Sequence, residues 1–138
     1  MLTLEIITPT QTLVTTEGDE ITLPTEQGMI GVRAGHLPLV TPLKPGEVTV
    51  HHDGRKESEH YVVAGGFAEV LPTGVHVLAD LAEHVKDIDE SAVQEAIKRA
   101  EDLKAASGDG RQLAQASALL EMNLAKLKAV KRRHRHHS

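Results

Sequence analysis

Histidine is the residue type in this sequence that most directly raises the question of chemistry, because a neutral imidazole is a common metal ligand. The chain contains nine histidines. His51 and His52 are adjacent in a segment that reads as a strand, so their side chains would point to opposite faces. If the Asp53–Gly54 pair forms a two-residue turn, His60 lies opposite Glu47 rather than beside another histidine. We therefore expect no metal site.

Nucleophilic and phosphate-binding chemistry find no support in the sequence. None of the five serines lies in a Gly-x-Ser-x-Gly elbow, and the Gly-x-x-x-x-Gly-Lys phosphate loop is absent. Cysteine is also absent, which excludes disulfides, thiolate ligands and cysteine nucleophiles. We expect no catalytic residue in this chain and no required cofactor.

The first part of the chain is patterned as a series of short strands. Leu2, Leu4 and Ile6 occupy alternate positions, and glycine and proline punctuate the segments that follow. Pro24 is expected to end one strand, and a return strand is expected to run from Arg55 towards Val63. The spacing predicts an antiparallel β sandwich of about ten short strands over residues 1–86.

Helical spacing replaces strand alternation near Asp87. Asp89 is a suitable N-cap, and residues 107–110 contain the glycines that would end a first helix. The apolar positions of that helix are Val93, Ala96, Ile97, Ala100 and Leu103. Those of a second helix, which begins near Arg111, are Leu113, Ala116, Leu120, Leu124 and Leu127. Residues 87–138 are therefore predicted to form an antiparallel helical hairpin, which its narrow, alanine-rich stripes would hold weakly.

Charge is distributed unevenly along the chain. Residues 1–84 carry 12 acidic and 4 basic groups, whereas residues 85–138 carry 8 acidic and 11 basic groups. The last thirteen residues, a basic His-rich tail, hold six cations and no acid: Lys126, Lys128, Lys131, Arg132, Arg133 and Arg135. This asymmetry predicts two regions with different partners. The net charge of −5 and the scarcity of aromatic residues argue against nucleic acid as one of them.

The segment Gly28–Leu39 combines three glycines and a proline with apolar residues, which by itself predicts a crossing between sheets. Together with Val63–Val70 and Val77–Asp80, it resembles the epsilon subunit of F-type ATP synthases. In that family a Gly-acidic-apolar-Gly-apolar run leads into Gly-His-x-Pro-Leu, and a Gly-Gly-Phe strand follows later. The resemblance extends from about Leu4 to Val130.

The resemblance implies a non-catalytic central-stalk subunit that couples the c ring to the gamma subunit and inhibits ATP hydrolysis through a mobile hairpin. Such a subunit is peripheral on the cytoplasmic face of the bacterial plasma membrane and reaches the membrane only through the complex. The residues implied at the c-ring and gamma interface are Met29, Ile30, Gly31, Val32, His36, Leu37, Pro38 and Leu39. Met29 stands where the family usually has an acid, so packing would replace a charge contact there.

The resemblance implies two further sites in the hairpin. Some bacterial relatives bind ATP through an Ile/Leu-Asp-x-x-Arg-Ala segment, but here Ala92 replaces the arginine and Met122 replaces another cation. The positions that still match are Glu83, Ile88, Asp89, Arg99 and Lys126, so we expect weak ATP binding. In the family the last helix meets the catalytic alpha and beta subunits, which makes the six cations an inhibitory basic helix. The alternative is a solvated helix end.

Two other interpretations stay open at this point. One is a stand-alone ATP-sensing or adaptor sandwich, and the other is a small β-barrel enzyme with a metal held by histidines. Co-purification with a rotary ATPase would separate the epsilon-subunit interpretation from both of these alternatives. Elemental analysis would test the metal-dependent enzyme.

Overall fold

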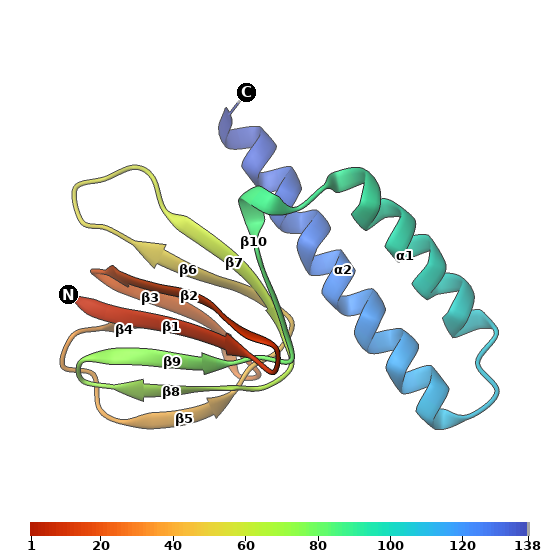
Figure 1. Ribbon diagram of the computed structural model, residues 1–138, viewed down its shortest axis with the longest axis horizontal. Helices are drawn as coiled ribbons and strands as arrows, with labels where there is room; N and C mark the ends of the chain where they lie inside the picture. The colour runs from red at the N-terminus through yellow and green to blue at the C-terminus, as the bar shows by residue number, and fades with distance from the viewer. Residues whose placement is uncertain (138) are drawn as a thin grey trace. The chain divides into compact units, whose positions relative to one another are not determined.

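The computed structural model describes the backbone of residues 1–137 and the side chains of residues 1–133. The chain divides into two compact units, Met1–His84 and Val85–Ser138 (Figure 1). The first is a sandwich of two five-stranded sheets, and the second is a helical hairpin. The fold class predicted from the sequence is therefore confirmed.

The first sheet, sheet A, has the strand order β2-β1-β9-β8-β5. Its strands are β1 (Leu2–Thr8), β2 (Gln11–Gly18), β5 (Leu39–Pro42), β8 (Phe67–Leu71) and β9 (Gly74–Leu78). Neighbouring strands are antiparallel except β1 and β9, which run parallel. The sequence did not predict β2, because its threonine-rich residues lack a clear alternation of apolar and polar types.

The second sheet, sheet B, is antiparallel throughout and has the order β10-β7-β6-β3-β4. Its strands are β3 (Glu20–Thr25), β4 (Gly28–Arg33), β6 (Gly46–His51), β7 (Glu59–Ala64) and β10 (Leu81–His84). Residues 34–38 carry the chain from β4 in sheet B to β5 in sheet A. The predicted crossing between sheets is therefore confirmed only for the second half of Gly28–Leu39, since the first half is β4 itself.

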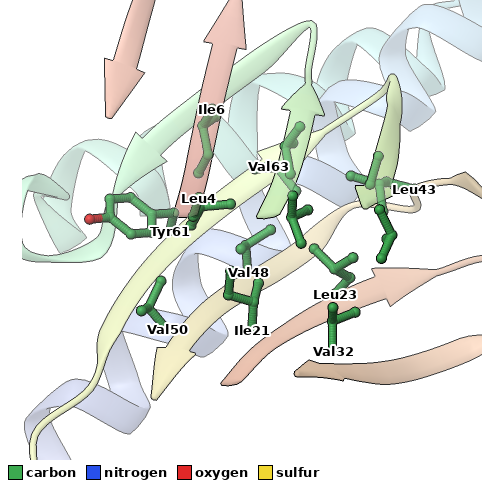
Figure 2. Packing of buried hydrophobic residues seen from close by; sticks show 14 of the residues in the cluster. Leu4, Ile6, Ile21, Leu23, Val32, Leu43, Val48, Val50, Tyr61 and Val63 are labelled. Atoms are coloured by element: carbon green, nitrogen blue, oxygen red, sulfur yellow. The ribbon is translucent and has the colours of Figure 1, made fainter. Parts of the chain in front are cut away.

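The two sheets enclose an aliphatic core. Strand alternation directs Leu2, Leu4 and Ile6 of β1 into the core, where all three are fully buried. Figure 2 shows residues of sheet B that meet them there: Ile21, Leu23, Val32, Val48, Val50, Tyr61 and Val63. Each large aliphatic side chain buried in this way stabilises the sandwich by about 1.5–3 kcal/mol.

A pair of glycines turns the chain from sheet B into sheet A. Gly65 and Gly66 have φ angles of 73° and 86°, which favour glycine. A Cβ atom at Gly66 would also collide with the backbone carbonyl of Leu78. The Gly-Gly pair is thus required by the geometry of the corner between β7 and β8.

The predicted two-residue hairpin at Asp53–Gly54 is wrong. β6 ends at His51 and β7 begins only at Glu59, so Thr49 rather than Glu47 lies directly opposite His60. Asp53 is engaged elsewhere, because its backbone N–H donates to the Asp19 carboxylate at 2.7 Å. A local turn does form there, but the polar segment that follows it does not join the ladder.

Pro24 does not end its strand, contrary to the prediction. β3 continues to Thr25 and pairs with β4 through Pro24, which lies opposite Met29. The pairing of β3 with β6 stops earlier, at Thr22, and the Pro24 carbonyl accepts a bond from Lys44 N at 2.9 Å. Proline is tolerated at such a position because only one neighbouring strand lies alongside.

The second unit begins with a 3-10 turn, η1 (Val85–Asp87), followed by α1 (Glu90–Ala105) and α2 (Gly110–His137). Asp89 is the N-cap of α1, as predicted, and its carboxylate accepts a bond from Ser91 N at 3.0 Å. Asp109 caps α2 by accepting a bond from Gln112 N at 2.8 Å. Among the residues described, no helix is both long and apolar enough to cross a membrane.

The apolar stripe predicted for α2 is partly wrong. Leu113 and Leu124 are 43% and 48% exposed, whereas Asn123 is buried. The buried row advances in steps of seven residues, two helical turns, from Ala116 through Asn123 to Val130, whereas the predicted stripe placed Leu124 eight residues from Ala116. Asn123 is tolerated there because its side-chain amide donates to the Leu119 carbonyl at 2.8 Å.

Tyr61 gives the sandwich a predictable alkaline sensitivity. Burial, followed by the nearby Glu59 carboxylate, raises the pKa of the Tyr61 hydroxyl to about 12. An unfolded tyrosine has a pKa of about 10. Between these values the unfolded chain loses the proton and the folded chain keeps it. The stabilisation is therefore complete below pH of about 10 and falls by about 2 kcal/mol as pH rises to about 12.

Denaturant titrations at several pH values check this expectation in the wild type and in Tyr61→Phe. The difference between the two proteins should change across the window from about pH 10 to 12, because phenylalanine has no proton to lose. A constant difference over that window would contradict the assignment.

Candidate functional site

The residues predicted for the c-ring and gamma interface do not form one patch. Met29 lies at the start of β4 and is 59% exposed, whereas Leu37 follows the other end of the strand and is 81% exposed. Between them Val32 is fully buried in the core. Gly35 N donates to the Pro72 carbonyl at 2.8 Å, which places this crossing beside the β8–β9 turn. Because β4 spans about 20 Å, the two exposed ends offer separate contacts.

The remaining members of the predicted set support the backbone or lie at the surface. Ile30 packs against the core, and a ring nitrogen of His36 lies 2.7 Å from the Leu37 carbonyl oxygen. Gly31, Pro38 and Leu39 are exposed.

The outer face of sheet A carries a row of apolar side chains that the sequence interpretation missed. The strand registers place Pro42 beside Phe67, Phe67 beside Leu78, and Leu78 beside Ile7. Phe67 and Leu78 are 44% and 40% exposed. A contiguous apolar row on a rigid sheet is typical of a protein-binding surface, whereas single exposed apolar residues are not. We call these four residues the sheet A row.

A charged row runs beside the sheet A row. Glu69 lies opposite His76, which lies opposite Glu5, and His76 Nδ1 is 3.3 Å from Glu5 Oε1. The next position on β5 is Val40, which is 63% exposed. An apolar row with polar groups at its margin has the composition of a protein interface.

Strand parity is the sequence signal that identifies the sheet A row. In β8, Ala68 and Val70 are buried, so Phe67 occupies the same parity as the outward Glu69. In β9, Leu78 shares the parity of His76. An apolar residue on the polar parity of a strand is the feature to look for, but it requires knowing which face is the core.

The outer face of sheet B carries surface ion pairs. Arg33 lies 3.3 Å from Asp53 and 3.4 Å from Glu20, and these acids, Asp53 first, raise the pKa of Arg33. His60 Nδ1 lies 3.6 Å from Glu47, diagonally across the ladder. Within the side chains the structure describes, no three His, Asp or Glu residues gather in a way that could hold a metal ion.

The residues predicted to bind ATP have diverse environments. Ile88 is buried, and the Asp89 carboxylate is occupied as the α1 N-cap. Arg99 is exposed on α1, about 15 Å along the helix from Asp89, and Lys126 is half-buried on α2. Glu83 belongs to β10 in the other unit. A shallow depression at the loop end of the hairpin is lined by other residues: Leu103, Ala106, Ser107, Gln112, Gln115, Ala116 and Leu119.

The predicted inhibitory cations also differ from one another. Lys128 and Lys131 are exposed, whereas Lys126, Arg132 and Arg133 are half-buried. The Arg133 guanidinium donates to the backbone carbonyl of Val85. The side chain of Arg135 lies outside the described residues.

Several large apolar side chains remain exposed on the hairpin. They are 39–56% exposed and comprise Leu103, Leu113, Leu119 and Leu124. The hairpin thus buries little of its own leucine surface, which is the property expected of an element that can open.

Comparisons of the sequence and of the structure with known proteins indicate the same family. Residues 1–85 match the family model for the ATP synthase delta/epsilon chain, beta-sandwich domain. The ATP synthase epsilon chain of Herminiimonas arsenicoxydans is 37% identical over 129 residues, which cover 94% of this chain and 92% of that relative. The epsilon chain of Moorella thermoacetica is 41% identical over 129 residues, which cover 94% of this chain and 96% of the relative.

Among solved structures, a cryo-EM structure of Euglena gracilis mitochondrial ATP synthase, containing OSCP, F1 and the c ring, includes a similar chain. The TM-score is 0.77 at 28% identity, and the match covers 94% of this chain and 81% of that one.

Proposed function

The chain belongs to the delta/epsilon-chain family of ATP synthase, and on this premise we propose that it couples the c ring to the gamma subunit and inhibits ATP hydrolysis through a mobile C-terminal hairpin. Members of this family are stalk subunits of a rotary enzyme, and the catalytic sites of ATP synthesis lie on other subunits. The chain would act at the cytoplasmic face of the bacterial plasma membrane and reach it only through the complex.

The observation that carries the proposal is the contrast between the surfaces of the two units. The sandwich presents the sheet A row on a rigid, fully packed scaffold, which suits a permanent contact with the gamma subunit. The exposed ends of β4, at Met29 and Leu37, would offer contacts to the c ring or to the gamma subunit. The hairpin instead combines poorly buried leucines with exposed cations, which suits reversible contact with the catalytic alpha and beta subunits.

A fragment that ends at Lys86 tests whether the sandwich alone binds the gamma subunit. It contains all ten strands and the complete sandwich core, so it should remain folded and bind the gamma subunit as the full chain does. Circular dichroism and titration calorimetry with purified gamma subunit are the measurements. Aggregation of the fragment, or loss of gamma binding while the full chain binds, would contradict the proposal.

We also propose that the isolated chain binds ATP weakly. Ala92 and Met122 supply no positive charge, so few cations remain to hold the phosphates. The Asp89 carboxylate is in addition engaged as the α1 N-cap. Calorimetry with MgATP should give a dissociation constant above about 100 μM. A low-micromolar constant, equivalent to about −8 kcal/mol, would show that other residues supply the missing contacts.

A further inference from the structure

Arg133, near the end of α2, contacts two backbone carbonyls at the start of the hairpin. The Arg133 guanidinium uses two nitrogens on two backbone carbonyls: Nη1 donates to Val85 O at 2.5 Å and Nη2 lies 3.5 Å from Ile88 O. The planar fork of arginine suits such paired acceptors, whereas lysine offers a single point of attachment. The contact joins the end of α2 to the 3-10 turn that leads into α1.

The surroundings of this contact favour its persistence. Val85 and Ile88 are each only 4% exposed, and Val130, on the preceding turn of α2, is fully buried. The Val85 carbonyl also accepts the bond from Ile88 N that closes the 3-10 turn. A charge-assisted bond in a partly buried setting is stronger than an exposed one.

The contact also closes a ring. Arg133 and Val85 are 48 residues apart in sequence, with both helices between them. If the hairpin straightened, these residues would separate by tens of ångströms, since each helical residue adds about 1.5 Å. Opening the hairpin therefore requires that the Arg133 bonds break.

We propose that Arg133 is a latch that holds the hairpin folded. In the proposed function the open hairpin is the inhibitory state, so the latch opposes inhibition of ATP hydrolysis, whereas the exposed cations Lys128 and Lys131 promote it. The part of this inference that concerns ATP hydrolysis rests on the proposed function. The latch itself rests only on the contacts within the hairpin. Arg133 is a positioning residue for the switch and need not touch the catalytic subunits.

Hydrogen exchange of the full chain tests the latch without the rest of the enzyme. In Arg133→Gln, the amides of residues 85–93 should exchange at least tenfold faster than in the wild type. Arg133→Lys keeps the charge but not the fork, so it should fall between the two. Lys131→Gln removes the same charge from an exposed position nearby and should leave the rates unchanged. Exchange in Arg133→Gln within twofold of the wild type would overturn the latch.

The rate of ATP hydrolysis by the assembled enzyme distinguishes the latch from the proposed inhibition by the hairpin, which we call the brake. If both proposals hold, Arg133→Gln should lower ATP hydrolysis because it favours the open hairpin, whereas Lys131→Gln should raise it. Faster exchange in Arg133→Gln with unchanged hydrolysis in both variants would support the latch and overturn the proposed brake. Increased hydrolysis in Arg133→Gln, equal to that in Lys131→Gln, would overturn the proposed effect of the latch on hydrolysis and leave Arg133 as one more inhibitory cation.

Discussion

Replacing Phe67 and Leu78 together by glutamate is expected to weaken binding to the gamma subunit by a factor of about 100 or more. The two side chains are neighbours at the centre of the sheet A row and are both substantially exposed. An aromatic anchor at the centre of an interface is a frequent hot spot. Losing the burial of both side chains removes about 3 kcal/mol or more, and placing carboxylates in the interface adds a desolvation cost.

Folding should survive the double substitution, because neither residue belongs to the buried core. Thermal unfolding of the variant checks this directly. A matched control replaces Leu113 and Leu124, two exposed leucines of the hairpin, by glutamate. Titration calorimetry should show gamma binding lost in the first variant and retained in the control. Wild-type affinity in Phe67→Glu/Leu78→Glu would mean that the sandwich uses another face.

Removing the basic end of the hairpin is expected to raise ATP hydrolysis by the assembled enzyme several-fold. Deletion of residues 111–138 removes α2 almost entirely, and changing the five terminal cations other than Arg133 to alanine removes charge while the Arg133 contact is kept. If the cations meet acidic surface on the catalytic subunits, both changes release the brake. The effect of the alanine variant should shrink at high salt, because screening already weakens exposed charge pairs in the wild type.

Two exposed lysines of α1 provide the control for charge. Lys98→Ala with Lys104→Ala lowers the positive charge of the same hairpin on its other helix and should leave hydrolysis unchanged. Wild-type hydrolysis by both the deletion and the five-alanine variant, over a range of salt, would leave these cations as a solvated helix end.

The sequence was sufficient for features that depend on local chemistry. The alternation of Leu2, Leu4 and Ile6 identified a core strand, and Asp89 was identified as a helix cap. The sequence was insufficient where contacts with segments distant in the chain determine the local structure. Pro24 continues its strand because β6 has already departed, and Asp53 leaves the hairpin ladder because Asp19 and Arg33 engage it.

The candidate site shows the same division. Met29 and Leu37 are exposed because they lie at the start of β4 and beyond its end. Their separation in space could not be predicted, because in the sequence they belong to one continuous motif. The sheet A row needs the pairing of four strands that are distant in sequence. Arg133 was grouped with the other cations because charge is visible in a sequence, whereas a bond to Val85 is not.

The proposed brake is tested most directly by the distance between the two helices inside the inhibited enzyme. Since the chain has no cysteine, labels at Gln94→Cys and Glu121→Cys would be unique within it, and both positions are exposed. In the folded hairpin, α1 and α2 pack together, which places the labelled positions within about 20 Å. Helices extended in line would separate them by about 40 Å. Pulsed electron paramagnetic resonance of the assembled enzyme should show the long distance when hydrolysis is inhibited and the short distance when it is active. The short distance alone, in enzyme that is nevertheless inhibited, would contradict a brake that works by extension.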